Sequence, residues 1–178
     1  MLEHAPVRAL AQDPRLRAIA GANAFAVRAI LFDKDPGANW ALGWHQDSSI
    51  AVRERLEVEG FGPWTVKDGV PHTIAPASLL SEMISLRVHL DACGAETGPL
   101  RVIADSHRHG RLTDAQVREL SASQPAVVCL AGAGDVLAFR PLLLHASSSS
   151  ASVARRRVLQ LEYARSELPG GLAWRWRC

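Results

Sequence analysis

Short runs of strand-forming residues, separated by turn residues, are the feature that most constrains how this chain can fold. Nine such runs can be read along the sequence: Phe25–Phe32, Trp40–His45, Ile50–Val52, Ile84–Leu90, Leu100–Ile103, Ala126–Leu130, Val136–Phe139, Leu142–His145 and Val158–Tyr163. Many short strands, in a chain with no room for repeated strand–helix–strand units, are typical of a sandwich, jelly roll or small barrel. The sequence therefore predicts a mainly β fold.

Only a few segments show helical spacing. In the N-terminal segment 1–21 the apolar residues recur mostly every three or four positions, Pro6 stands at a first-turn position and Gly21 follows the last periodic residue. Two further patches, Ala77–Met83 and Asp114–Leu120, are predicted to be helical, and Thr113 can cap the second. Short helices are therefore expected to flank the β structure.

The length of 178 residues predicts one domain, 1–178, that includes the helical segment at its N-terminus. Hydrophobic residues make up 48% and charged residues 21%, as in ordinary globular proteins. A chain of this size buries enough surface to fold without disulfides or a structural metal. A metal ion, if the chain binds one, is therefore expected to serve chemistry.

Charge and hydropathy exclude several classes of partner. The 20 Lys and Arg residues against 18 Asp and Glu leave a net charge of +2, which does not favour nucleic acid. No apolar run is long enough to span a membrane, and charges interrupt the N-terminus where a signal peptide would need an apolar core. With three scattered cysteines, the sequence predicts a cytoplasmic protein that acts on a small molecule.

The C-terminal tail is unusually rich in tryptophan. Trp174 and Trp176 are expected to cover a hydrophobic edge of the fold. The apolar tail to which they belong is also a candidate interface for a homo-oligomer.

The most informative short motif is His45-Gln46-Asp47. Side chains two apart in a strand emerge on the same face, so an imidazole and a carboxylate at this spacing can bind one metal ion. One more nitrogen would complete the two-His-one-carboxylate arrangement that leaves coordination positions open on non-haem Fe(II). His145, at the end of an apolar run, is the best candidate. Alone, a His-x-Asp pair is also typical of a solvated strand end.

An arginine shortly after His145 has a matching physical role. Arg156 begins a strand-forming run after a serine-rich connector, and a guanidinium there could bind the far carboxylate of 2-oxoglutarate while the other end of that molecule chelates iron. Strand alternation sends Arg155 and Arg157 to the opposite face. A slip of one residue in register would exchange the two faces.

Together these segments resemble the phytanoyl-CoA dioxygenase family of Fe(II)- and 2-oxoglutarate-dependent oxygenases. The resemblance runs from about Phe25 to Trp176 and rests on FDKDPGANWALGWHQD, FGPWTVKDGVPHTIAP, RVHLD, TGPLRVIADSHRHGRL, GAGDVLAFRPLLLHASS, RRRVLQLEYA and ELPGGLAWRW. It implies a double-stranded β-helix, that is a jelly-roll, cupin-like barrel. The chain departs from the family in having Ala104-Asp105 where Pro-Gly is usual.

The family resemblance also implies a set of site residues. Fe(II) would be bound by His45, Asp47 and His145; Arg156, Ser147 and Trp64 would form the 2-oxoglutarate pocket, with O2 as the second cosubstrate. The reaction would convert 2-oxoglutarate to succinate and CO2 and hydroxylate an unactivated C–H bond, and the presence of Asp47 disfavours halogenation. The alternative is a non-oxygenase metal-binding jelly roll with a hydrolytic or ligand-binding role.

The remaining polar residues are weaker candidates. Arg87 lies in a strand where an inward guanidinium would need an anion, so it is a candidate for contact with substrate or cosubstrate. The other candidates are Lys34, Arg53 and His72 at the pocket edge or the surface, Trp40 and Trp44 as walls of the metal site, His89 as a hydrogen-bonded core histidine, and His107 and His109 as turn residues. The sequence does not identify the primary substrate.

Overall fold

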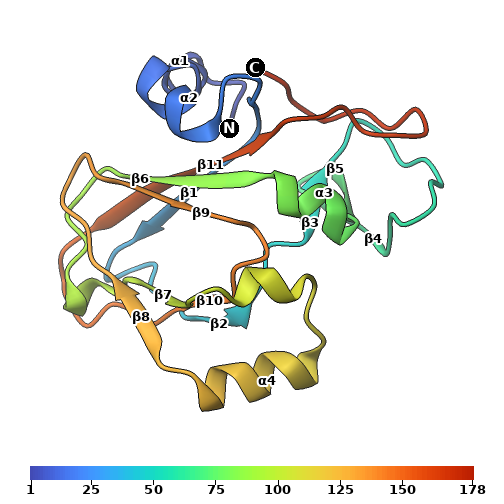
Figure 1. Cartoon of the computed structure of the whole chain (residues 1–178). Coiled ribbons are helices and arrows are strands. Elements are labelled where there is room, and N and C mark those ends of the chain that lie inside the picture. Colours follow the sequence, from blue (N-terminus) through green and yellow to red (C-terminus); the bar gives the residue numbers. More distant parts are fainter.

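The predicted strands form two four-stranded antiparallel sheets in a computed structural model that describes residues 1–178 (Figure 1). The larger sheet has the order β1 (Phe25–Lys34), β11 (Arg156–Ala164), β6 (Ile84–His89), β9 (Val136–Phe139). The smaller sheet has the order β2 (Leu42–His45), β10 (His145–Ser147), β7 (Leu100–Ile103), β8 (Ala126–Cys129). From β6 onward the chain passes back and forth between the two sheets, as in a double-stranded β-helix, so the predicted jelly-roll fold is confirmed.

Helices cover the outside of this framework. The α-helices are α1 (Ala5–Ala11), α2 (Pro14–Ala20), α3 (Ala77–Glu82) and α4 (Asp114–Ser123), with short 3-10 turns η1 (Ala95–Thr97) and η2 (Ser106–His109). α1 and α2 lie on the outer face of the larger sheet (Figure 1), and the Tyr163 hydroxyl of β11 donates to the Ala11 carbonyl over 2.9 Å. Thr113 and Gln116 form a reciprocal capping box at the start of α4. None of the helices has both the length and the apolar character that a bilayer crossing requires.

A third sheet contains the predicted run Ile50–Val52, as β3 (Ser49–Ala51), together with two strands that were not predicted from the sequence. It consists of β3, β5 (Val70–Ile74) and β4 (Trp64–Lys67), in that order. β4 and β5 are joined at Asp68 and Gly69, which have φ values of 49° and 74°. An Asp-Gly pair between strand-forming residues favours a tight hairpin turn, because both positions tolerate positive φ. This Asp-Gly signal lies outside the nine strand-forming runs read from the sequence.

One predicted strand is displaced. The run Leu142–His145 was expected to be a strand, but residues 141–144 form a turn and β10 begins only at His145. Pro141 has no N–H to give to a ladder, and the Leu143 N–H closes the turn by donating to the Arg140 carbonyl over 2.8 Å. Leu142 and Leu144 are buried in the interior, so the apolar run reflects burial of a turn and not a strand.

The C-terminal tail packs against the chain itself. Trp174 belongs to a buried cluster with Ile50 and Leu80, and Trp176 packs against the cluster beneath α1 and α2. The prediction that these tryptophans cover a hydrophobic edge is confirmed. The second expectation, that the apolar tail provides a homo-oligomer interface, stays a prediction.

β11 is buried on both faces. Leu159, Leu161 and Tyr163 face the outer cluster under α1 and α2. Arg156, Val158, Gln160 and Glu162 alternate with them and face the space between the two large sheets, and all four are buried. Burying polar side chains costs free energy unless each has a hydrogen-bond partner, so this face is a candidate functional site.

The outer face of β11 predicts a stability difference. Leu161 is fully buried, whereas Leu31 on the neighbouring strand β1 is 37% exposed. Leu161→Ala should lower the free energy of unfolding by about 2–5 kcal/mol, because it leaves a cavity between sheet and helices. Leu31→Ala should cost less than half as much in the same urea titration. Equal losses for the two variants would contradict the core that we describe.

Candidate active site

Three candidate metal ligands meet at one end of the smaller sheet. His45 ends β2 and His145 begins β10, and these two residues are direct partners in the antiparallel ladder, with ring centroids 4.2 Å apart. Asp47 follows two residues after His45, and its N–H donates to the Pro141 carbonyl over 2.8 Å. The Asp47 carboxylate oxygens lie 3.9 Å from His45 Nε2 and 3.7 Å from His145 Nε2. This is the chain's one cluster of three His, Cys, Asp or Glu side chains with metal-ligand geometry.

The two imidazoles are oriented by the backbone. His45 Nδ1 lies 2.7 Å from the Gly43 carbonyl oxygen, and His145 Nδ1 lies 2.7 Å from that of Leu143. A carbonyl only accepts, so each Nδ1 carries the proton and each Nε2 presents its lone pair toward Asp47. Burial lowers the pKa of His145, which keeps this ring neutral. Two neutral imidazoles and one carboxylate in this arrangement fit a divalent metal ion.

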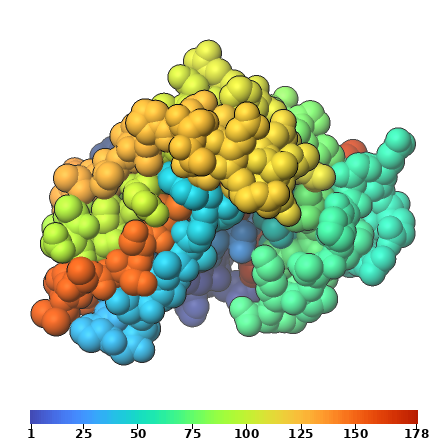
Figure 2. Space-filling model, turned by 90° about the horizontal axis from the view of Figure 1, so that it is seen from below, coloured from blue at the N-terminus to red at the C-terminus, as the bar shows by residue number.

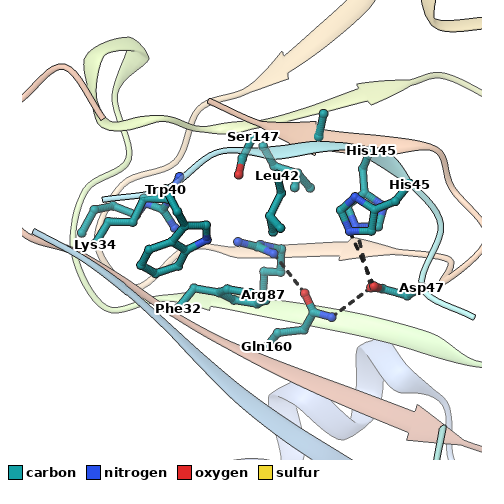
Figure 3. A pocket seen from close by; sticks show the side chains of 13 residues that line it. Phe32, Lys34, Trp40, Leu42, His45, Asp47, Arg87, His145, Ser147 and Gln160 are labelled. Atoms are coloured by element: carbon teal, nitrogen blue, oxygen red, sulfur yellow. Dashed lines mark hydrogen bonds and ion pairs between the residues drawn. The ribbon is translucent and has the colours of Figure 1, made fainter. Parts of the chain in front are cut away.

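A cleft extends from these ligands between the two large sheets (Figure 3). Its lining consists of Phe32, Lys34, Trp40, Leu42, His45, Asp47, Arg87, Leu100, His145, Ala146, Ser147, Arg156 and Gln160. Seen from below, the molecule is hollowed between the cyan residues around β2 and the green residues of the β4–β5 region (Figure 2). The candidate metal ligands therefore lie in a cleft that contains both aromatic and charged side chains.

Three cations converge in this cleft. Lys34, Arg87 and Arg156 are only 1%, 6% and 2% exposed, and Asp47 is the only carboxylate among the lining residues. Burial, and secondly the neighbouring Arg156 charge, lower the pKa of Lys34 to about 8 and that of Arg87 to about 10. Buried cations in excess over buried anions are costly, so the cleft is suited to an anionic ligand.

Arg156 points inward, as strand alternation predicts. Its Nε donates to the Thr97 carbonyl over 3.3 Å and its Nη2 to the Gly98 carbonyl over 3.1 Å. Gly98 has a φ of 64°, and a Cβ there would collide with the backbone of Ser148. On the opposite face, Arg155 pairs with Asp33 and Arg157 with Asp91, each through two short hydrogen bonds. The register slip considered from the sequence does not occur.

Several lining residues were missed or underrated by the sequence analysis. Lys34 was expected mainly at the surface. Instead, its ammonium donates to the Ser148 carbonyl over 2.6 Å and lies 5.3 Å from the Trp40 ring centroid. Trp40 lines the cleft as expected, whereas Phe32 and Leu42 were not singled out. Phe32 also packs against the Arg87 guanidinium, 4.8 Å from ring centroid to Cζ.

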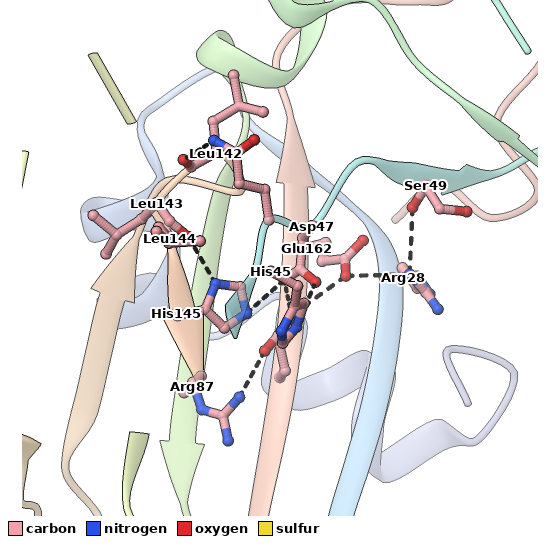
Figure 4. A network of polar contacts seen from close by, with 12 residues as sticks. Arg28, His45, Asp47, Ser49, Arg87, Leu142, Leu143, Leu144, His145 and Glu162 are labelled. Atoms are coloured by element: carbon pink, nitrogen blue, oxygen red, sulfur yellow. Dashed lines mark hydrogen bonds and ion pairs between the residues drawn. The ribbon is translucent and has the colours of Figure 1, made fainter. Parts of the chain in front are cut away.

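Two polar residues of β11 were also missed. Gln160 Nε2 donates to Asp47 Oδ2 over 3.2 Å, and Gln160 Oε1 accepts from Arg87 Nη1 over 3.0 Å (Figure 3). Glu162 accepts from Gln160 Nε2 over 3.4 Å and pairs with Arg28 over 3.5 Å (Figure 4). Both residues share a strand face with Arg156, so alternation from Arg156 was the signal that could have found them.

Three predicted site residues lie elsewhere. Trp64, expected as a wall of the 2-oxoglutarate pocket, lies on β4, where it is partly buried and packs against the core cluster that contains Ile50 and Leu80. Arg53 is exposed at the surface. His72 is buried in β5, where its Nδ1 contacts the Val70 carbonyl over 2.9 Å, and it lines a different groove. The structure thus brings Arg87 into the cleft but none of these three: Trp64 and His72 lie on the unpredicted β4–β5 hairpin, and Arg53 lies after β3.

The other histidines do not take part in the ligand cluster. His107 and His109 lie in η2, which supports the turn interpretation. Asp105, at the departure from the family pattern, precedes this turn with a φ of 59°, a conformation that Asp tolerates better than most residues. His89 is buried as expected, but both of its ring nitrogens lack a hydrogen-bond partner, so the expectation of a hydrogen-bonded core histidine is wrong.

Comparison with known proteins supports the same site class. The family model for phytanoyl-CoA dioxygenase matches residues 3–158. A search of curated proteins finds no match. The sequence resemblance based on Phe25–Trp176 is therefore supported by an independent match over most of the chain.

Solved structures share the fold. AviO1 from Streptomyces viridochromogenes Tue57 has a TM-score of 0.64 and 25% identity, covering 93% of this chain and 64% of that one. EctD from S. alaskensis with bound Fe has a TM-score of 0.63 and 25% identity, covering 90% and 53%. The carbocyclase SnoK from nogalamycin biosynthesis, described as non-haem and α-ketoglutarate-dependent, has a TM-score of 0.65 and 16% identity, covering 92% and 60%. The chain thus spans between about half and two thirds of the length of these three proteins.

Burial of Glu162 predicts a pH-dependent stability difference. Burial raises the pKa of this carboxyl to about 7 in the folded protein, against 4.5 for the free side chain. Between these values the folded state holds a proton that the unfolded state has released, so stability is lost as pH rises through 7. Glu162→Gln removes this effect and should gain about 2 kcal/mol relative to wild type between pH 5 and pH 8, by urea unfolding of the metal-free protein.

Glu82→Gln is the matched control, because Glu82 lies exposed on α3. Its difference from wild type should stay constant over the same pH range. A constant difference for Glu162→Gln as well would contradict the assigned burial of the Glu162 carboxyl.

Proposed function

Since the chain belongs to the phytanoyl-CoA dioxygenase family, we propose that it is an Fe(II)- and 2-oxoglutarate-dependent dioxygenase that hydroxylates an unactivated C–H bond of a small molecule. One observation carries the proposal: a two-His-one-carboxylate cluster and three buried cations line the same cleft. The cluster could bind a metal ion, and the cations could bind a dicarboxylate beside it. EctD has been solved with Fe, and also with 2-oxoglutarate and 5-hydroxyectoine at 24% identity, which supports the same pairing in this chain.

His45, Asp47 and His145 would bind the metal. Three protein ligands leave coordination positions for the cosubstrates. When bound, Fe(II) supplies the O2 chemistry, in which 2-oxoglutarate becomes succinate and CO2. The protein orients the two Nε2 lone pairs through the carbonyls of Gly43 and Leu143 and limits access of water to the buried His145.

Arg156 and Ser147 would bind the far carboxylate of 2-oxoglutarate. Arg156 has two of its nitrogens on backbone carbonyls, which fix the guanidinium plane and leave Nη1 without a protein partner. Ser147 lies two residues after His145, and its side chain lines the same cleft (Figure 3). A dianion would offset the excess of buried cations, to which Lys34 and Arg87 also contribute.

The primary substrate would then approach the remaining open side of the metal. Arg87 is the predicted substrate residue that lies in the cleft, and its Nε is buried without a partner. A carboxylate ligand at position 47 occupies the coordination site that a halide would need, which favours hydroxylation over halogenation. Arg53 and His72 lie away from this cleft, so we assign them no part in the reaction.

The test is an anaerobic titration of the protein with Fe(II) and then 2-oxoglutarate. We expect the visible charge-transfer band that arises when 2-oxoglutarate chelates Fe(II), and loss of this band in His145→Ala. No band in wild-type protein, or an unchanged band in His145→Ala, would refute the proposal. A protein that binds zinc and forms no band would instead fit the hydrolytic or ligand-binding alternative.

The anchoring role of Arg156 gives a separate prediction. Arg156→Ala should raise the 2-oxoglutarate concentration at half-saturation of the band about 100-fold, since a buried charged partner of a carboxylate is removed. Arg155→Ala is the control, because Arg155 pairs with Asp33 on the outer face. Its half-saturation should stay within about twofold of wild type. A larger effect in Arg155→Ala than in Arg156→Ala would show that the anchor is assigned to the wrong residue.

A further inference from the structure

We propose that Gln160 is a positioning residue: it holds the Oδ2 atom of Asp47, so that Oδ1 is presented to the metal, and Arg87 sets its orientation. This inference rests on the proposed function and adds a residue to it. It starts from the burial of Gln160, which is only 1% exposed and lies between the cationic cleft and the candidate metal ligands. Figure 3 shows Arg87, Gln160 and Asp47 as one chain of contacts.

The orientation of the Gln160 amide follows from donor and acceptor chemistry. Arg87 can only donate, so the atom 3.0 Å from Arg87 Nη1 must be the amide oxygen. The amide nitrogen then faces the other way, toward Asp47. If Arg87 were absent, either end of the amide could face the carboxylate, and an oxygen there would repel it.

Both hydrogens of the Gln160 amide nitrogen are used by carboxylates. One contact is to Asp47 Oδ2 at 3.2 Å and the other to Glu162 Oε1 at 3.4 Å. Glu162 is itself held by Arg28, whose Nη1 also lies 3.4 Å from the Ser49 carbonyl (Figure 4). With its oxygen accepting from Arg87, the buried amide has both its oxygen and its nitrogen engaged in hydrogen bonds. Its position is therefore fixed from three sides.

This arrangement matters because a carboxylate can bind a metal through one oxygen or two. Engaging Oδ2 in a hydrogen bond favours binding through Oδ1 alone and so preserves the open positions that the reaction requires. Asp47 is on an irregular segment after β2, so its side chain has less support from the sheet than His45 or His145. Gln160 supplies that support from the opposite sheet.

The experiment is a titration of the metal-free protein with Co(II), which is redox-stable and gives an absorption spectrum sensitive to coordination number. Gln160→Met keeps the length and apolar volume of the side chain but removes its three polar contacts, to Arg87, Asp47 and Glu162. We expect its Co(II) dissociation constant to rise about 10- to 100-fold, with a changed visible spectrum. Gln160→Asn, whose shorter amide cannot span these contacts, should show the same loss and decides the question if Gln160→Met does not fold.

Val158→Ala is the matched control. Val158 is fully buried on the same face of β11, between Arg156 and Gln160, and it has no polar contact to lose. It should destabilise the strand yet leave Co(II) affinity within about threefold of wild type. Equal weakening in Val158→Ala and Gln160→Met, or wild-type affinity and spectrum in folded Gln160 variants, would overturn the positioning role. Failure of the proposed function is distinguishable, because wild-type protein would then form no Fe(II)–2-oxoglutarate band.

Discussion

The polar inner face of β11 is the constraint on which the rest of the structure depends. On the outer face of β11, burial of Leu159, Leu161 and Tyr163 offsets the conformational entropy that the strand loses on folding. The inner face has no such offset, because Arg156, Gln160 and Glu162 are removed from water and each then needs a partner. The partners come from other elements: carbonyls near η1 for Arg156, Asp47 and Arg87 for Gln160, and Arg28 for Glu162. The same contacts that stabilise the strand therefore assemble the site.

Positive and negative side chains of the cleft lie at different positions along this face. Arg156 lies at the start of β11, opposite Lys34 of β1, and Gln160 lies further along, where it meets the candidate metal ligand Asp47. Glu162 and Arg28 lie beyond it, 3.5 Å apart. A dicarboxylate that bridged Arg156 and a metal at Asp47 would thus lie where positive charge is in excess. Arg87, between the two ends, contacts the cleft and at the same time orients the amide that supports Asp47.

Local sequence patterns predicted those parts of the site that depend on strand geometry. The His-x-Asp spacing predicted that His45 and Asp47 lie together, although Asp47 follows β2 on an irregular segment, and alternation predicted that Arg156 points inward with its neighbours outward. The same alternation also predicts that Gln160 points inward, four residues after Arg156. Lys34 was not predicted to be buried, because it stands in a charged run that is typical of a turn and is buried only through Trp40 and the distant Ser148 carbonyl. Trp64, which the family resemblance implied as a pocket wall, lies on the β4–β5 hairpin and packs against the core outside the cleft lining.

The central claim is that His45, Asp47, His145 and Arg156 form one oxygenase centre. The most direct measurement is the yield of succinate per O2 consumed when Fe(II)-loaded protein is supplied with 2-oxoglutarate and air. We predict one succinate for each O2, dependent on Fe(II), with the rate in Asp47→Ala at least 100-fold lower. Succinate formation that persists in Asp47→Ala, or O2 consumption without succinate in the wild-type protein, would contradict the account.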